Sequence, residues 1–600
     1  MRRSRVAGLL TAAILVSAPV VPAHAVQISL RVTDARVTGG QDPTLVLSGT
    51  VTNTGTAPLS DTVRLRTSGQ VATRTELDTL LTTGTAPTAR DLPYTFQITD
   101  LAPGTAAAWT LTAPMGDWAQ RMAGVIGVGA RVGDQQQMTA VPWWPAGTLP
   151  RDPTRVTFAV QVALPAGDPL AGPAGLDVAD QQMARLERLT ATGPFGLWVD
   201  PHVRQWLAQF AGTPLEARAS ALQNALAPAR PMVTGGARLD RLAAAGRNDL
   251  IDLLVADTTP VYLPASSDAA TITALGSRAL TVVGNDTVAP SRLTTVAAHG
   301  MVSGLPVLVA DRGLGGCLDA SSPQPGAAAR CLTATIAMVT AESPNIARHV
   351  LVVTPRLWDP NELEVRQISA LLTGASYAIG APLTSPPPDA PELTMTSAQP
   401  PGAFSRRVLR DVDDLLALAH EVGSLFPGSA QAAQLRTLAV ACLAESTSKE
   451  QATTWLEAGM QLGKEMTDAV TIETTGRFTV PTASTEIPFT VVNDASEAVS
   501  VGIAVTADNP SRLTSTPSET VTVDSGQRVV VPVQVSITGV GTIGAAAHLV
   551  TADGTRVGQP VRLTITTTAS QRFARNLVWI ALAALLVLSG NSWRTRRNPT

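Results

Sequence analysis

The chain has 600 residues, a formal net charge of −3 and 15% charged residues. This balance, without a basic stripe, excludes the surface typical of nucleic-acid-binding proteins, and the length predicts about three to five domains. Three cysteines are too few for a disulfide-based scaffold.

The N-terminus has the pattern of a secretory signal peptide. Three arginines among the first five residues precede an apolar run over residues 6–16, and Ala23 and Ala25 form a small-x-small cleavage site. We therefore expect residues 1–25 to be removed by cleavage after Ala25. A retained N-terminal membrane helix is the alternative, but the apolar run is short for a span.

The C-terminus predicts one transmembrane helix. Residues 577–588 form an unbroken apolar run, which its flanks extend to a span over residues 574–593. The arginines of the tail, residues 594–600, favour the cytoplasmic side. We expect a single-pass protein of the cell membrane, with the bulk of the chain extracytoplasmic and the tail cytoplasmic. A buried C-terminal helix is the alternative.

Two segments predict immunoglobulin-like β-sandwiches. Residues 26–148 contain short alternating strands, two of which flank a turn at Asn53, and residues 468–568 return to the same pattern. Short strands with frequent Gly, Pro and Asn turns are typical of antiparallel sandwiches.

The central segment, residues 154–383, alternates apolar strands with helical stretches. This order predicts a parallel sheet, and about seven strand candidates favour a closed barrel-like α/β domain over an open sheet. A Pro-rich linker over residues 384–404 and a helical segment over residues 405–466 follow. The fold class is therefore multidomain. The strand candidates are residues 156–164, 196–200, 251–256, 259–263, 280–283, 305–310 and 350–354.

Four aspartates are the candidate catalytic residues: Asp200, Asp257, Asp268 and Asp311. Each stands at the end of a predicted strand or in the loop after one, where carboxylates of a barrel converge and can act as general acids and bases. The alternative is structural, because Asp is a favourable helix cap. No motif indicates a metal or cofactor site, and none is expected.

Cys317 and Cys331 are predicted to form a disulfide. They bracket a loop of mostly small residues, which a bridge would close in an oxidising compartment. Cys442 lies in a helical stretch and is interpreted as a small buried apolar residue. Whether it is free stays open.

Several segments together resemble a known family. These are WVDP (residues 198–201), YLPASSDAATITAL (262–275), LVVTPRLWDP (351–360) and IPFTVVNDASEAVSVGIAVTADNPSRL (487–513). They are similar to a family of large exported actinobacterial envelope proteins of unknown function (DUF6049-like). The resemblance implies a central domain similar to the barrels of polysaccharide deacetylases and some glycoside hydrolases. It also implies genes that often neighbour that of the lipid II flippase.

This resemblance leads to two functional hypotheses. The first is a membrane-anchored extracytoplasmic protein, a non-catalytic binding or scaffold component of cell-envelope (peptidoglycan) assembly. Its partners would be the membrane and a cell-wall glycan or a lipid II-pathway membrane protein, without nucleic acid. The alternative is an envelope carbohydrate-active enzyme that uses the strand-end carboxylates. Ala265 and Ser266 stand where the family implies a more acidic pattern, which puts inherited catalysis in doubt.

Overall fold

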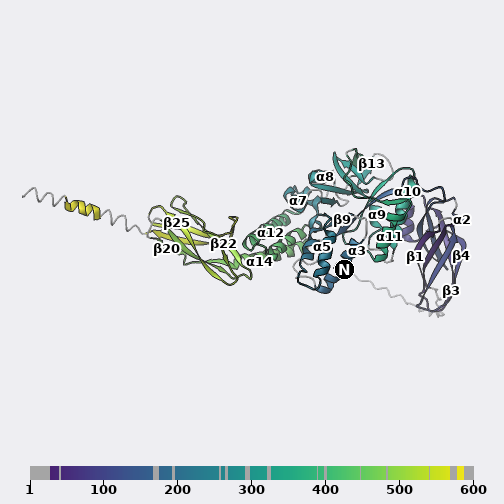
Figure 1. The fold of residues 1–600 in the computed structure, drawn as a ribbon, viewed down its shortest axis with the longest axis horizontal. Helices are drawn as coiled ribbons and strands as arrows, with labels where there is room; N and C mark the ends of the chain where they lie inside the picture. The colour runs from purple at the N-terminus through teal and green to yellow at the C-terminus, as the bar shows by residue number, and fades with distance from the viewer. Residues whose placement is uncertain are drawn as a thin grey trace, which may run out of the picture.

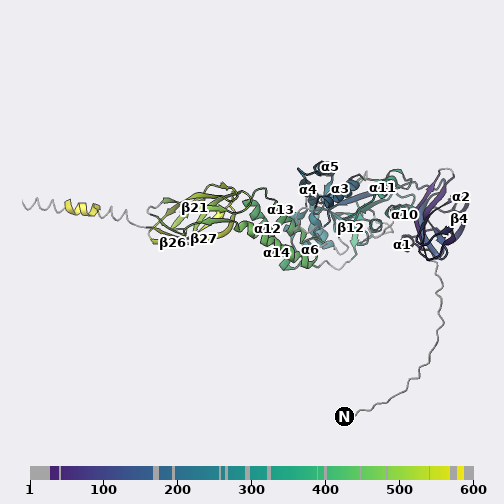
Figure 2. The same cartoon turned by 90° about the horizontal axis from the view of Figure 1, so that it is seen from below.

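The computed structural model describes residues 27–567 and 578–586, apart from 40–41, 120, 166–174, 192–195, 256–258, 264–267, 291–296, 320–325, 388, 397–401, 446, 481–483 and 540. An N-terminal sandwich, a barrel, a helical segment and a second sandwich follow one another along one axis (Figures 1 and 2). The predicted signal peptide, with Ala23 and Ala25, lies outside the described residues.

The N-terminal sandwich packs a three-stranded sheet, β1-β2-β5, on a four-stranded sheet, β4-β3-β6-β7. Burial alternates along β2, so Leu45 and Leu47 face the core. Gly49 lies on the same face, and a side chain is excluded there because a Cβ would come within 2.4 Å of the Trp109 ring. The elements are β1 (Ile28–Thr38), β2 (Thr44–Asn53), β3 (Leu59–Gln70), α1 (Arg74–Thr83), β4 (Arg90–Leu101), β5 (Ala106–Pro114), α2 (Met115–Trp118), β6 (Gly124–Val132) and β7 (Gln135–Trp143).

The central domain is a parallel barrel wall with one opening. Seven parallel strands run in the order β10-β9-β8-β16-β15-β12-β11, so the first strand, β8, lies beside the last one, β16. The edge strands β10 and β11 are not hydrogen-bonded to each other within the described residues. The strands are β8 (Thr154–Val162), β9 (Gly196–Val199), β10 (Arg230–Pro231), β11 (Thr259–Tyr262), β12 (Ala279–Gly284), β13 (Val288–Pro290), β14 (His299–Val302), β15 (Leu305–Ala310), β16 (His349–Val353), β17 (Ala378–Gly380) and β18 (Leu393–Met395).

Side chains fill the inside of this barrel, as in a packed core. Trp198, Met232 and Leu308 belong to one buried cluster with Leu351 and Val282. Helices surround the strands: α3 (Leu176–Thr190), α4 (Pro201–Ala208), α5 (Glu216–Leu226), η1 (Thr234–Gly236), α6 (Leu239–Ala244), α7 (Asn248–Leu254), α8 (Ala269–Leu275), η2 (Gly276–Arg278), α9 (Arg312–Gly316), α10 (Ala327–Glu342) and α11 (Glu362–Gly374).

One predicted barrel strand is wrong. Residues 251–256 were expected to be a strand, but residues 251–254 end helix α7, and the two-residue strand β10 takes the place in the wall. A short apolar run fits a buried strand and a buried helix equally well, so its periodicity does not decide. The expected linker over residues 384–404 also contributes a strand, β18, which pairs with β13.

The helical segment contains α12 (Arg406–Leu425), α13 (Ala430–Ala441) and α14 (Lys449–Asp468). A serine side chain caps the start of each helix. Helices α12 and α14 approach closely at Gly463, where a Cβ would lie 2.4 Å from the Leu418 side chain. The loop between α13 and α14 reaches back to the barrel, because Arg238 N–H donates to Leu443 O over 2.9 Å.

The C-terminal sandwich packs a four-stranded sheet, β19-β21-β25-β23, on a five-stranded sheet, β20-β27-β26-β22-β24. It joins the helical segment through Gly558 N–H, which donates to the Glu421 carboxylate over 3.0 Å. The strands are β19 (Val470–Glu473), β20 (Arg477–Val480), β21 (Ser484–Asn493), β22 (Val499–Ala507), β23 (Leu513–Ser515), β24 (Val521–Val523), β25 (Arg528–Ile537), β26 (Gly541–Val550) and β27 (Arg556–Thr567).

The expected transmembrane span over residues 574–593 is not supported. Among the described residues, no helix is long and apolar enough to cross a membrane. The expectation of a single-pass membrane protein with a cytoplasmic tail over residues 594–600 rested on this span and is corrected with it.

Candidate functional site

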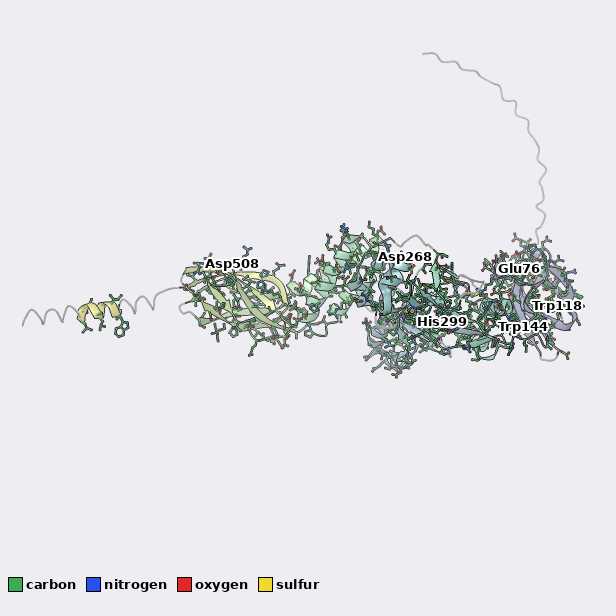
Figure 3. The ribbon with its side chains drawn as sticks, turned by 90° about the horizontal axis from the view of Figure 1, so that it is seen from above. Glu76, Trp118, Trp144, Asp268, His299 and Asp508 are labelled. Carbon is green, nitrogen blue, oxygen red and sulfur yellow. A yellow bond between two sulfur atoms is a disulfide. The ribbon has the colours of Figure 1, made fainter. Side chains whose placement is uncertain are left out.

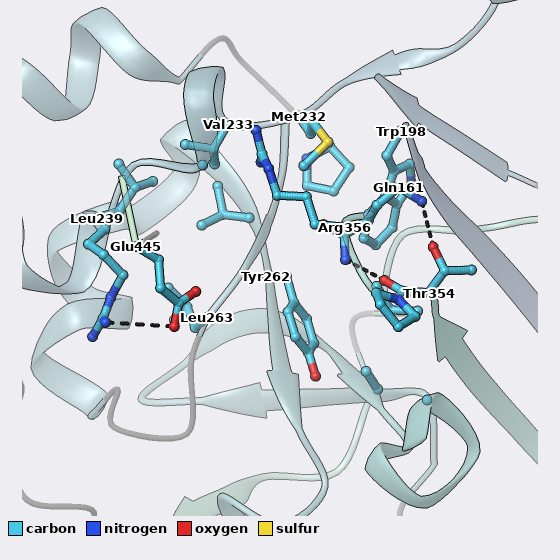
Figure 4. A pocket seen from close by; sticks show the side chains of 18 of the residues that line it. Gln161, Trp198, Met232, Val233, Leu239, Tyr262, Leu263, Thr354, Arg356 and Glu445 are labelled. Carbon is cyan, nitrogen blue, oxygen red and sulfur yellow. Dashed lines mark hydrogen bonds and ion pairs between the residues drawn. The ribbon is translucent and has the colours of Figure 1, made fainter. Parts of the chain in front are cut away.

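A cavity of ≈ 680 Å³ opens at the carboxyl ends of the barrel strands (Figure 4). Its lining comes from the ends of β8, β9, β11, β15 and β16 and from the segment after β10. This is the edge where the loops after parallel strands converge, and the volume lies within the ~300–1,000 Å³ of ligand pockets. The cavity is therefore the candidate site.

Asp200 is a buried structural carboxylate beside this cavity. It is the N-cap of α4 and accepts hydrogen bonds from the backbone N–H groups of His202, over 3.0 Å, and Gly235, over 3.1 Å. The guanidinium of Arg356, which lines the cavity, forms an ion pair with it. Burial lowers the pKa of His202. With three partners, Asp200 holds the loops after β9, β10 and β16 together.

Asp311 lines the cavity and is also engaged. Its carboxylate caps α9 by accepting from Leu314 N–H over 3.1 Å, and it pairs with Arg74 over 2.8 Å. Arg74 begins α1 of the N-terminal sandwich, so the sandwich supplies the counter-charge for a carboxylate at the barrel mouth. The side chain of Asp311 is only 5% exposed.

Of the other two candidates, Asp268 does not line the described cavity. Asp268, which Figure 3 labels, caps α8 by accepting from the N–H and the hydroxyl of Thr271, both over 2.8 Å. Asp257 lies outside the described residues. Of the four aspartates, Asp311 lines the cavity. Asp200 does not line it but forms an ion pair with Arg356, which does.

The helical segment contributes to the cavity lining beside the segment that follows β10. Glu445, in the loop between α13 and α14, lines the cavity, and its backbone N–H donates to Gly236 O over 3.3 Å. Its carboxylate lies 3.8 Å from Arg238, whose guanidinium also binds the buried Asp240 over 2.8 Å. The wall therefore contains residues from two parts of the chain (Figure 4).

Two aromatic residues, Trp198 and Tyr262, belong to the apolar part of the lining, together with aliphatic side chains such as Met232 and Leu263. Trp198 is 1% exposed, and its indole Nε1 has no acceptor among the described residues. The Arg312 guanidinium lies 5.3 Å from the centre of the Tyr262 ring, and burial raises the pKa of the Tyr262 hydroxyl. Gln161 is fixed against Thr354, to whose carbonyl it donates over 2.7 Å.

Sequence reasoning missed most of these lining residues. Tyr262 and Arg356 lie within segments that carry the family resemblance, next to strand ends, and a search for all polar residues after strands would have found them. Arg74 and Glu445 carry no such signal, because they reach the site from other parts of the chain.

The structure joins Cys317 and Cys331 in a disulfide, with their Cα atoms 5.4 Å apart. Cys442 is a free, buried thiol whose pKa burial raises to about 12. Within the described residues, no group of His, Cys, Asp and Glu is arranged to hold a metal ion.

A family model described as a family of unknown function (DUF6049) matches residues 390–598. The matched region contains the helical segment with Glu445 and the C-terminal sandwich, and the barrel precedes it. No curated protein matches the chain.

Solved structures match only parts of the chain. A C. elegans protein of the MSP family, WR4, is 7% identical over 17% of this chain and 98% of its own, with a TM-score of 0.13. A FixG-related protein from Vibrio parahaemolyticus is 11% identical over 14% of this chain and 79% of its own, with a TM-score of 0.12. β-Glucosidase 3B from Thermotoga neapolitana is 15% identical over 20% of this chain and 16% of its own, with a TM-score of 0.14. Likenesses at these TM-scores carry no argument about function.

Proposed function

We propose that this protein is a non-catalytic glycan-binding component of cell-envelope assembly, and that it binds the glycan in the cavity at the barrel mouth. The observation that carries the proposal is the state of the two candidate aspartates there, Asp200 and Asp311. Asp200 and Asp311 each cap a helix and each pair with an arginine, Arg356 and Arg74. A carboxylate committed to such partners is poorly placed to transfer protons.

A glycan fits the remaining lining. Sugar rings have apolar faces and a rim of hydroxyl groups, so they need aromatic surface together with fixed donors and acceptors. Tyr262 supplies a partly exposed ring, and Arg238, Arg356 and Glu445 supply the polar groups. Of the partners that the sequence suggests, this cavity favours a cell-wall glycan over a lipid II-pathway membrane protein.

The envelope setting rests on the resemblance of the sequence to exported proteins, because the matching family model is of unknown function. The match over residues 390–598 includes the loop that carries Glu445, so the matched region contributes one wall of the cavity. The wider resemblance, to exported actinobacterial proteins whose genes neighbour the lipid II flippase, agrees with a role in wall assembly.

Isothermal titration of the full chain tests the proposal. The probes are tetramers of N-acetylglucosamine and of glucosamine, and the variant is Tyr262→Ala. We expect at least one tetramer to bind and the variant to bind it about tenfold more weakly, because a lost ring contact is worth ~0.5–1.5 kcal/mol beyond its buried area. Tyr94→Ala, in the N-terminal sandwich, is the matched control and should bind as the unaltered chain does. Absence of binding by both tetramers, or equal binding by Tyr262→Ala, would overturn the proposal.

A further inference from the structure

The lining of the cavity runs around the barrel axis. It comes from the carboxyl ends of the barrel strands β8, β9, β11, β15 and β16 and from the segment after β10. Because β10 and β11 are the two edges of the wall, residues such as Val233, after β10, and Leu263, after β11, line the same cavity from opposite edges. Glu445 joins the lining beside the segment after β10. The cavity is therefore a pit at the barrel axis and not a groove across the surface.

A packed layer closes this pit from below. Side chains alternate between the two faces of a strand, so Gln161 and Ala159 of β8 point to the inside of the barrel in successive layers. Val353 and Leu351 of β16 do the same. Gln161 and Val353 line the cavity, whereas Ala159 and Leu351 lie one layer deeper and are 0% exposed. The pit is therefore blind: a chain can enter it at the mouth but cannot pass through it.

A fixed hydrogen-bond acceptor lies at the floor of the pit. Gln161 is 8% exposed, and its amide nitrogen donates to the Thr354 carbonyl over 2.7 Å (Figure 4). Its backbone N–H donates to the Thr354 hydroxyl over 2.9 Å. Because a carbonyl only accepts, the first bond fixes the amide with its nitrogen toward Thr354. The Oε1 atom accepts from no described residue and, unlike the indole Nε1 of Trp198, is not sealed off. It is free for a donor on a ligand.

We propose that the cavity binds the end of a glycan chain, with the terminal sugar inserted and one of its hydroxyl groups donating to Gln161 Oε1. This inference rests on the proposed function and specifies which part of the glycan is bound. A blind pit admits a chain end. An internal segment continues in both directions, so it could only lie across the mouth, out of reach of the floor.

Isothermal titration of the full chain with end-blocked tetramers tests the inference. The probe is the tetramer of glucosamine or of N-acetylglucosamine, whichever binds more tightly. One derivative carries an aminobenzamide label on its reducing end, and the other a benzylidene acetal on its non-reducing sugar. We expect one of the two to bind about tenfold more weakly than the free tetramer, because its bulky end clashes with the walls of the pit. The other should bind as the free tetramer does.

A substitution at the floor tests the hydroxyl contact. Gln161→Leu is similar in size and has no acceptor, so the free tetramer should bind about tenfold more weakly, because the inserted hydroxyl loses water without gaining a partner. Gln209→Leu, at the exposed C-cap of α4 and outside the lining, is the matched control and should keep the affinity. The end-blocked probes need no variant, so they decide the inference even if Gln161→Leu fails to fold.

The outcomes separate this inference from the proposed function. If both blocked derivatives bind as the free tetramer does, the site takes an internal segment and the inference is overturned. If a folded Gln161→Leu keeps the affinity of the unaltered chain, the hydroxyl contact is wrong and the inference is overturned as well. If neither free tetramer binds, the proposed function itself fails.

Discussion

Arg74 of the N-terminal sandwich donates to the carboxylate of Asp311 at the barrel mouth over 2.8 Å, and to Glu342 over 3.1 Å. Asp311 in turn accepts from Leu314 N–H at the start of α9. The first domain therefore neutralises a buried charge of the second, directly in the wall of the candidate site. The sandwich and the barrel are electrostatically linked through this residue pair.

Removing the arginine tests that link. Arg74→Ala leaves Asp311, 5% exposed, without its counter-charge, so we expect the free energy of unfolding to fall by about 1–3 kcal/mol. Urea unfolding followed by circular dichroism measures it. Arg36→Ala removes a pair with Asp34 in which the arginine side chain is 62% exposed, and should change stability by about 0.5 kcal/mol or less. Equal effects of the two variants would contradict a buried, stabilising pair.

A buried asparagine fixes the same turn in both sandwiches. Asn493 donates to Glu497 O over 2.8 Å and to Val523 O over 2.9 Å, and it accepts from Ala495 N–H over 3.0 Å. Asn53 makes the equivalent bonds, donating to Ala57 O and Leu101 O and accepting from Gly55 N–H.

Replacing Asn493 by Ala should therefore cost about 2–3 kcal/mol, because it leaves buried backbone groups without partners. The thermal unfolding of the variant measures this loss. Asn509→Ala, at an exposed turn of the same sandwich, is the control and should cost about 1 kcal/mol or less. A loss as small as that of the control would show that the turn does not depend on Asn493.

Thiol counting tests the disulfide. The denatured chain should show one reactive thiol, that of Cys442, before reduction and three after it. The double variant Cys317→Ser/Cys331→Ser should lose about 3 kcal/mol of stability, because the bridge closes a loop of 14 residues. Three thiols before reduction would rule the bridge out.

Two neighbouring histidines, at the starts of β14 and β16, should make stability depend on pH. The rings of His299 and His349 lie 4.9 Å apart, and His349 Nε2 is 2.7 Å from the Thr157 hydroxyl. Burial, followed by the charges of His299 and Arg155, lowers the pKa of His349 from 6.5 to about 4. The unfolded chain therefore binds more protons between these values, and stability is lost as pH falls from about 6.5 to about 4.

Unfolding at a series of pH values measures this loss. His349→Gln should reduce the dependence, whereas His420→Gln, whose side chain is 63% exposed, should leave it unchanged. An unaltered pH profile in His349→Gln would assign the dependence to other groups.

Local features were readable from the sequence, and distant ones were not. Alternation along residues 44–52 predicts the strand that β2 forms, and the aspartates suggested as helix caps are the caps of α4, α8 and α9. Such signals depend on neighbours two to four residues away. The Arg74–Asp311 pair joins residues 237 positions apart, and only the packing of two domains brings them together.

The same limit applies to the cavity. Its position at the strand ends follows from barrel topology, which the alternation of strands and helices indicates. The contribution of Glu445 depends on a contact between the loop after α13 and the segment after β10, and β10 has only two residues and no apolar run. The strand assigned to residues 251–256 failed for a related reason, since apolar content alone does not distinguish a strand from a helix.

The central claim is that the barrel binds glycan without altering it. The most direct measurement incubates the full chain with the glucosamine and N-acetylglucosamine tetramers and analyses bound and free sugar by mass spectrometry. The account predicts that at least one tetramer is retained by the protein, intact in length and in acetyl content. Shorter oligosaccharides, or loss of acetyl groups that depends on Asp200 or Asp311, would contradict it and show an enzyme.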